Sequence, residues 1–245
     1  MKTNYCLPII RNTKNEVLET IEKYRAEYAF FEVWLDYIED LSADFIDTLI
    51  KGNEKRIIVL FRRKNLEKPT MTPTLQNAII ENLVNKHMLL DVDVENQRDI
   101  LDYIQENKLF VRLITSFHEY THTPTNQILQ AVLDKMKGYT PLIYKISTYC
   151  KEKEDSIRLL KLLLTLKKEN KRCIMLGMGE HGIMTRIFGT LWGNEMIFAP
   201  QTTSESSALG QLTKEQLESI FDIIDIKSEA RNPKSETNSK FKNTK

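Results

Sequence analysis

The sequence contains few of the residues that define disulfide-rich or linker-rich proteins. Among 245 residues there are only three cysteines, eight glycines and seven prolines. The cysteines Cys6, Cys150 and Cys173 are odd in number, far apart and set in apolar segments. This spacing argues against a disulfide framework and favours reduced thiols in the core of a cytoplasmic protein.

Long hydrophobic runs and a charge excess are absent too. No stretch approaches the ~20 apolar residues of a membrane span, and the first residues lack the long hydrophobic region of a secretion signal. The 35 basic and 34 acidic residues give a formal net charge of +1, so no overall field favours nucleic acid or an anionic membrane. We expect neither partner, and a small polar substrate is compatible with this balance.

The sequence does contain short β-rich runs that alternate with longer segments of helical periodicity. The predicted strands are residues 5–10, 30–36, 56–62, 87–94, 109–118, 142–149, 172–177 and 196–200. The predicted helices include residues 14–28, 73–85, 95–106, 123–137, 152–168 and 213–224. No linker interrupts this alternation, which predicts an α/β fold, a single-domain (β/α)8 TIM barrel over residues 1–226.

The end of the chain differs in composition from the rest. Residues 231–245 contain five basic side chains and one acidic side chain, with almost no apolar residues. We therefore expect residues 227–245 to form a polar, basic, disordered tail. A nucleic-acid-binding arm is the alternative for this segment.

Lys145 lies in an apolar run, where a buried ammonium must be paired, hydrated or neutralised by a lowered pKa. Strand alternation puts Lys145 on one face with Ile143 and Ser147, and we expect this face to point into the barrel. A neutral amine there can attack a ketone. The plainer alternative is a lysine that reaches solvent at the end of a strand.

Further candidates stand where predicted strands end, which is where barrel proteins gather their active sites. His118 ends the fifth strand and Arg62 the third, so an imidazole lies on the strand next to that of the amine. Gly177, Gly179 and Gly182 form the G-x-G-x-x-G pattern of a dinucleotide-binding turn, but after the seventh strand instead of in an opening βαβ unit. We interpret these glycines as serving tight turning and close packing.

Four segments together carry a family resemblance. They are SFHEY (116–120) with TP at 123–124, YKI (144–146), MGEHGIMTR (178–186) and SALGQ (207–211). In their order, and in their places on the predicted elements, they resemble the type I 3-dehydroquinate dehydratases, the Schiff-base enzymes of the shikimate pathway. The resemblance spans nearly the whole barrel.

The resemblance implies a carbon–oxygen lyase of aromatic amino-acid biosynthesis that dehydrates 3-dehydroquinate to 3-dehydroshikimate. Lys145 would form an imine with the substrate ketone. His118 would remove a proton beside the imine and return a proton to the leaving hydroxyl. No metal or organic cofactor is expected, and the family is typically homodimeric.

The same resemblance assigns substrate ligands. Arg186 matches the arginine that binds the substrate carboxylate, because a guanidinium supplies a bidentate fork. Ser207 and Gln211 match ligands on the loop after the eighth strand, and Glu32 matches an acid that contacts substrate hydroxyls.

The chain departs from the family at three of these places. Trp34 stands where the pattern Glu-x-Arg-x-Asp has arginine, so an indole replaces a charged substrate contact. Asp93 stands where the family tends to have glutamate, a longer acid. Leu209 replaces a proline in the loop after the eighth strand, which loosens that loop.

The third strand leaves an alternative open. The family has Phe-Arg, three residues and then a glutamate that orients the catalytic histidine. Counted from Arg62, the substrate-binding match, this spacing reaches Leu66. Counted from Arg63, it reaches Glu67, which would restore the acid as a catalytic residue.

Two other functions remain open on the sequence. A barrel that binds a small hydroxy acid without efficient catalysis would tolerate these departures. A class I aldolase-like lyase would use the same imine for carbon–carbon cleavage, and would need a phosphate-binding turn after the seventh or eighth strand.

Overall fold

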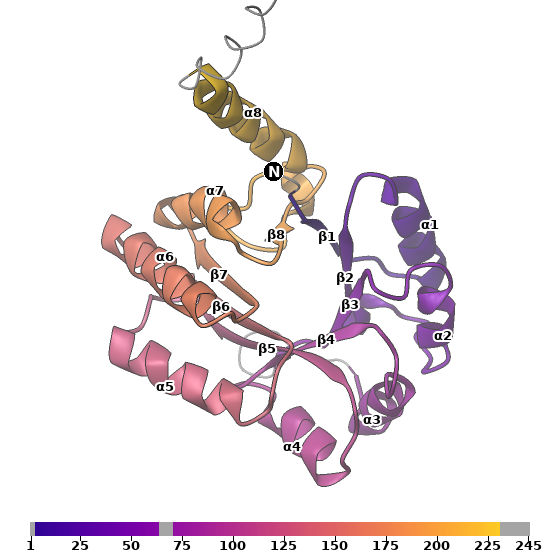
Figure 1. The fold of residues 1–245 in the computed structure, drawn as a ribbon. Helices are drawn as coiled ribbons and strands as arrows, with labels where there is room; N and C mark the ends of the chain where they lie inside the picture. Colours follow the sequence, from indigo (N-terminus) through magenta and orange to yellow (C-terminus); the bar gives the residue numbers. More distant parts are fainter. Residues whose placement is uncertain (1–2, 64–70, 231–245) are drawn as a thin grey trace, which may run out of the picture.

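The computed structural model describes residues 3–63 and 71–230, and within them eight parallel strands form one curled sheet (Figure 1). The order across the sheet is β7-β6-β5-β4-β3-β2-β1-β8. The strands are β1 (Tyr5–Ile9), β2 (Phe30–Trp34), β3 (Ile57–Leu60), β4 (Leu89–Asp93), β5 (Arg112–Glu119), β6 (Ile143–Tyr149), β7 (Cys173–Met178) and β8 (Ile197–Phe198).

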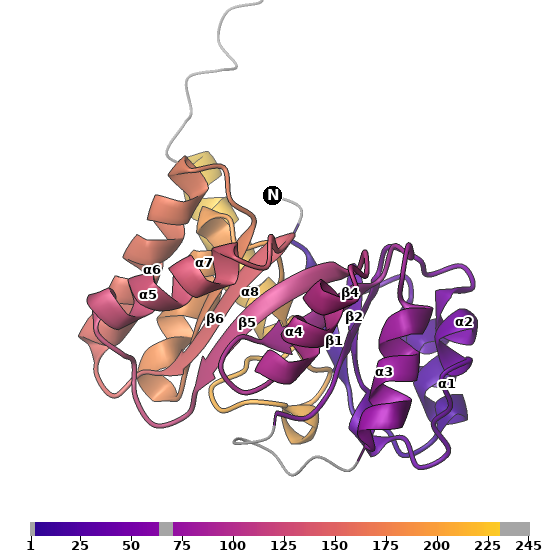
Figure 2. The same ribbon diagram turned by 90° about the horizontal axis from the view of Figure 1, so that it is seen from below.

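Helices alternate with these strands and lie outside the sheet (Figures 1 and 2). They are α1 (Lys14–Tyr24), α2 (Phe45–Ile50), α3 (Pro73–Asn82), α4 (Arg98–Glu106), α5 (Asn126–Lys137), α6 (Lys153–Lys168), α7 (Ile183–Trp192) and α8 (Lys214–Ala230), with short 3-10 turns at Leu35–Tyr37, Glu180–Gly182 and Thr203–Glu205. The predicted (β/α)8 barrel is therefore confirmed.

Local sequence explains where several of the helices begin. Thr13 caps α1 by accepting a hydrogen bond from the backbone of Glu16, whose side chain returns a bond to the backbone of Thr13. Thr72 and Thr125 cap α3 and α5 in the same way with their hydroxyls. Such caps satisfy backbone N–H groups that have no partner inside the helix.

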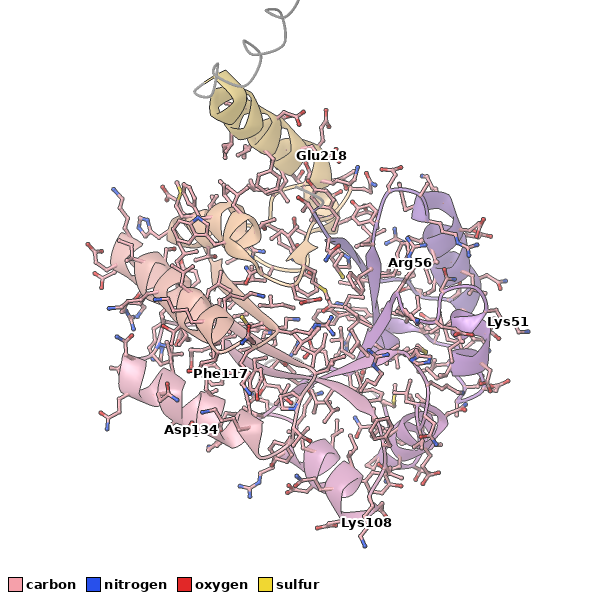
Figure 3. The ribbon with its side chains drawn as sticks, in the orientation of Figure 1. Lys51, Arg56, Lys108, Phe117, Asp134 and Glu218 are labelled. Atoms are coloured by element: carbon pink, nitrogen blue, oxygen red, sulfur yellow. The ribbon has the colours of Figure 1, made fainter. Side chains whose placement is uncertain are left out.

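Apolar side chains of the strands and helices form the core, and charged side chains lie on the outer surface. Strand residues such as Phe31, Val59 and Ile146 are fully buried. The charged side chains of Lys51 and Asp134 lie on the outer surface (Figure 3). This distribution is the one that burial of apolar area requires.

The register of the strands selects which polar residues face inward. Ser116 pairs with both Asp93 and Lys145 on the neighbouring strands, and Glu32 is two residues from Trp34 on β2. Because side chains alternate along a strand, inward-facing residues recur at every second position. The barrel interior therefore receives polar groups from β2, β4, β5 and β6.

Strands β7 and β8 stand at the two ends of this order, and among the described residues no strand ladder joins them. Other hydrogen bonds connect β7 with the segment that leads into β8. The Glu195 backbone N–H donates to the Cys173 carbonyl at 2.9 Å. The Asn194 side chain accepts from the Met175 backbone N–H at 2.8 Å and donates to the Met175 carbonyl at 3.1 Å. These bonds attach the segment before β8 to β7.

The glycine pattern after β7 is explained by close packing. A Cβ on Gly177 would lie 2.6 Å from both the Gly182 Cα and the Cys150 Sγ. Gly179 has a φ of 78°, which favours glycine. The packing interpretation of this pattern is thus supported directly by the geometry.

The end of the last helix differs from expectation. Helix α8 continues to Ala230, past the predicted domain end at residue 226, and it extends away from the barrel in Figure 1. Residues 231–245, the remainder of the expected tail, lie outside the described residues. None of the helices in the described ranges combines the length and hydropathy needed to cross a membrane.

Candidate active site

A cavity opens at the carboxyl ends of the strands, inside the barrel. Its lining includes Glu32, Trp34, Arg63, His118, Lys145, Arg186, Ser207 and Gln211. The structure thus gathers six of the side chains predicted from the sequence into one space, although they come from five separate parts of the chain.

Lys145 is buried and paired. Only 5% of it is exposed, and its Nζ donates to Asp91 Oδ2 at 2.7 Å and to Glu32 Oε1 at 3.2 Å. The ammonium also lies 4.3 Å from the centroid of the Phe198 ring. A lysine in this apolar run could be paired, hydrated, neutralised or directed to solvent. In the structure Lys145 is paired with carboxylates and does not reach solvent.

The pKa values of this group follow from burial and charge. Burial disfavours the ammonium, but Asp91 and Glu32 outweigh it and raise the pKa of Lys145. Burial likewise disfavours the Asp91 carboxylate, but Lys145 and then Arg63 lower its pKa to about 2. In the resting protein Lys145 is therefore protonated, so its pKa is not lowered to give a neutral amine.

His118 is oriented by Asp93. The imidazole Nδ1 lies 2.9 Å from Asp93 Oδ2, and the His118 backbone N–H donates to the same oxygen at 2.9 Å. The other oxygen of Asp93 accepts from the backbone of Glu95 and Asn96. A carboxylate held in this way fixes Nδ1 as the protonated nitrogen, which leaves Nε2 as the basic one.

Burial and the charge of Arg63 lower the pKa of His118, against the opposing effect of Asp93. The imidazole is consequently neutral at neutral pH. Because a neutral imidazole accepts a proton, His118 has the state that a general base needs.

Arg186 provides a positive charge that has no ion-pair partner among the described residues. It lies in the first turn of α7, is 1% exposed, and its Nε and Nη1 have no hydrogen-bond partner among the described residues. Burial lowers its pKa to about 10, so the guanidinium stays charged at neutral pH. A buried cation of this kind is suited to an anionic ligand.

The loop after β8 is folded onto the turn after β7. Ser207 and Gln211 bond each other, with the Ser207 backbone N–H donating to Gln211 Oε1 at 2.9 Å and Gln211 Nε2 donating to Ser207 Oγ at 3.0 Å. The Gly179 backbone N–H donates to the Leu209 carbonyl at 3.2 Å. These bonds hold hydroxyl and amide groups at the cavity.

The third strand delivers Arg63 to the cavity in place of the predicted Arg62. Strand β3 ends at Leu60, so regular alternation does not continue to these residues. Arg62 instead lies outside, with its guanidinium carbon 3.8 Å from the Tyr37 ring centroid and its backbone N–H donating to Asp36. Glu67, the predicted orienting acid, lies outside the described residues.

Sequence reasoning named Asp93 only as a departure from a family pattern and gave Asp91 no role. The signal that could have found their roles is their spacing, because residues two apart on β4 both point inward. Tyr120 was not assigned a role either, although its ring packs edge-on against His118 with centroids 6.3 Å apart. Among the described residues, no cluster of three metal-ligating side chains is present.

The family model described as type I 3-dehydroquinase matches residues 5–228. The 3-dehydroquinate dehydratase of Coxiella burnetii (strain CbuK_Q154) is 29% identical over 220 residues, which cover 88% of this chain and 91% of that protein. The enzyme of the same name from Methanocaldococcus jannaschii is 25% identical over 229 residues, with 91% and 99% covered.

Solved structures with the same fold include two dehydratases. The crystal structure of 3-dehydroquinate dehydratase from Geobacillus kaustophilus HTA426 has a TM-score of 0.73 at 22% identity, covering 93% of each chain. The type I enzyme from Clostridium difficile, with covalently modified comenic acid, has a TM-score of 0.74 at 18% identity, covering 92% of this chain and 93% of that one.

We expect Asp91→Asn to remove a pH-dependent contribution to stability. Because the folded-state pKa of Asp91 is depressed to about 2, its carboxylate stabilises the fold above the unfolded-state pKa, and this contribution is lost as the pH falls from about 4 to about 2. The loss at neutral pH should be on the order of 2 kcal/mol. Urea denaturation of both proteins across this pH range measures the difference.

Lys145→Met is the matched control, since it removes the main cation that depresses the pKa of Asp91. In that background the acid-side loss of stability should disappear. A difference between wild type and Asp91→Asn that is constant down to about pH 2 would contradict the role of this ion pair.

Proposed function

The chain belongs to the type I 3-dehydroquinase family, and from this premise we propose that it dehydrates 3-dehydroquinate to 3-dehydroshikimate through an imine on Lys145. The observation that carries the proposal is the buried amine in one cavity with a neutral, oriented imidazole and an arginine that, within residues 3–63 and 71–230, has no counterion. The reaction would belong to the shikimate pathway of aromatic amino-acid biosynthesis. We also infer a cytoplasmic location, which fits the three buried free cysteines.

Imine formation begins with loss of a proton from the Lys145 ammonium. The neutral amine attacks the substrate ketone, and the carbonyl oxygen leaves as water to give an iminium cation. Asp91 and Glu32, which stabilise the ammonium, lie where they also stabilise this cation. Since the pKa of Lys145 is raised, formation of the imine should accelerate with rising pH.

Elimination follows from the iminium. His118 takes a proton from the carbon beside the iminium, and the electron pair of that C–H bond moves toward the cationic nitrogen. The resulting imidazolium returns the proton to the leaving hydroxyl, which departs as water. Hydrolysis of the conjugated imine then releases the product and restores the Lys145 amine.

The remaining side chains bind the substrate. Arg186 pairs with its carboxylate, and Ser207 and Gln211 bond its hydroxyls, which requires them to exchange their mutual bond for substrate contacts. Glu32 accepts from a further hydroxyl. On the third strand, we propose that Arg63 acts as the substrate-side arginine in place of Arg62.

The two other functions suggested by the sequence are less well supported. A hydroxy-acid-binding barrel without catalysis would not need a neutral His118 fixed by Asp93. An aldolase-like lyase would require a phosphate site at the glycine turn after β7, where Gly177 and Gly182 are packed against each other.

A homodimer is the oligomeric state that we infer. Helices α6 and α7 expose an apolar surface formed by Ile157, Met184, Phe188 and Trp192, and the Phe188 and Trp192 rings lie 5.5 Å apart between centroids. Lys153 and Glu180 also border this surface. A two-fold contact of this surface with a second copy would allow these opposite charges to pair across the interface.

Borohydride trapping tests the imine. We expect purified protein mixed with 3-dehydroquinate and borohydride to gain a substrate-sized mass on the peptide that contains Lys145. His118→Asn should retain this adduct but lose turnover by at least about 100-fold, because proton transfer follows imine formation. Intact-mass spectrometry and an optical assay of the conjugated product measure both.

Lys145→Met is the control for trapping and should give neither adduct nor product. If folded wild-type protein yields no adduct and no product, the dehydratase proposal is wrong. Pyruvate released from a keto acid, with no reaction on dehydroquinate, would favour the aldolase-like alternative.

Arg186→Met tests carboxylate binding. We expect kcat/KM to fall by roughly 100-fold, mainly through a higher KM, because a charged pair with the substrate is lost. Stability should be unchanged or increased, since the variant removes a buried charge that has no counterion in the part of the chain that the structure describes. Steady-state kinetics and thermal unfolding measure the two effects.

Arg172→Met is the matched control, because that guanidinium pairs with Glu195 away from the cavity. It should leave KM within about twofold of wild type. An unchanged KM in Arg186→Met, or an equal change in both variants, would contradict the assignment.

The dimer is tested by Trp192→Glu, which puts a charge in the α6–α7 surface. We expect wild type to sediment as a dimer at micromolar concentration and the variant as a monomer, since an unpaired charge in an apolar interface is costly. Ile223→Glu, at an exposed apolar residue of α8, is the control and should remain dimeric. A monomeric wild type, or a dimeric Trp192→Glu variant, would show that this surface is not a dimer interface.

A further inference from the structure

Trp34 is an indole inside a cavity of charged groups. It ends β2, is 9% exposed, and lines the same cavity as Lys145. Its Nε1 donates to Glu32 Oε2 at 3.2 Å. The ring also lies under a cation, with the guanidinium carbon of Arg63 5.6 Å from its centroid.

The two oxygens of Glu32 have different partners. Oε1 accepts from Lys145, and Oε2 accepts from the Trp34 indole. Asp91 also accepts from Lys145, and at 2.7 Å its bond is the shorter of the two. Glu32 is therefore held from one side by the reactive nitrogen and from the other side by Trp34.

Imine formation changes the number of donors on that nitrogen. An ammonium has three N–H groups, whereas an iminium has one, so it can satisfy Asp91 or Glu32 but not both with linear bonds. The closer carboxylate, Asp91, is placed to keep the single N–H. Glu32 then loses its bond to Lys145, and the indole N–H is its remaining protein donor among the described residues.

We propose that Trp34 is a positioning residue that holds Glu32 in place when Lys145 changes from ammonium to iminium. The indole bond keeps Oε1 directed at the reacting centre, where it can accept from a substrate hydroxyl. This inference rests on the imine mechanism proposed above. It assigns a specific task to the indole N–H. If Trp34 only filled space, that N–H would have no part in the reaction.

Trp34→Phe tests this task, because it keeps an aromatic ring and removes the N–H. We expect the trapped adduct to form as in wild type and kcat to fall about tenfold, as loss of one bond to a charged group predicts. In a Glu32→Gln background, which removes the charge being held, the same substitution should change kcat by less than about twofold. The double-mutant cycle thus separates action through Glu32 from packing.

Tyr103→Phe is the matched control. It removes another aromatic donor to a glutamate, the Tyr103 hydroxyl bond to Glu81 Oε1 at 2.6 Å on the outer surface. Its kcat should equal that of wild type. The role of Trp34 is overturned if Trp34→Phe lowers kcat equally in both backgrounds, or if its kcat stays within about twofold of wild type. Turnover by the wild-type protein would leave the dehydratase proposal intact in either case.

A second measurement needs no variant at Trp34. The chain has two tryptophans, so Trp192→Phe assigns both indole N–H signals by difference in a ¹H–¹⁵N spectrum. We expect Glu32→Gln to move the Trp34 signal and leave the Trp192 signal in place. An unmoved Trp34 signal overturns the inference, and absence of the wild-type imine adduct overturns it together with the proposed mechanism.

Discussion

The buried ion group around Lys145 is the constraint on which the rest of the site depends. Removing an ammonium from water is costly, and the cost is offset here by Asp91 at 2.7 Å and Glu32 at 3.2 Å. Asp91 is in turn stabilised as an anion by the lysine, and a second cation, Arg63, lies in the same cavity. Removal of Lys145 would leave two buried carboxylates without this ion pair, and removal of either carboxylate would leave the ammonium with only the other.

The barrel makes this group possible because its strands are parallel and staggered. Glu32, Asp91 and Lys145 come from β2, β4 and β6, and the strand register offsets each of them by two residues from the one before, since Glu32 is in line with Leu89 and Lys145 with Asp93. Because barrel strands tilt and stagger in this way, the three side chains still meet inside the barrel. The outward-facing neighbours remain apolar and pack against helices, so stability and chemistry use alternate positions of the same strands. Such a separation lets several charges occur in a core without disturbing the packing outside it.

Much of this arrangement could be predicted from the sequence where regular alternation applies. The inward positions of Lys145 and His118 follow from period-two patterns inside long strands. The choice between Arg62 and Arg63 stayed open on the sequence, because β3 ends at Leu60 and the backbone beyond it is irregular. The bond between Asp93 and His118 was missed since it depends on how far a short carboxylate reaches, which spacing alone does not give.

The raised pKa of Lys145 has a cost and a benefit at different steps of an imine mechanism. The carboxylates that keep the amine protonated reduce the fraction of nucleophile at neutral pH, which slows attack. The same carboxylates face a cation after attack, and because they are already oriented they need no reorganisation to stabilise it. An additional arginine at position 34 would add positive charge near that cation. The indole of Trp34 instead offers a neutral donor to Glu32, so it supports the anion without weakening its effect on Lys145.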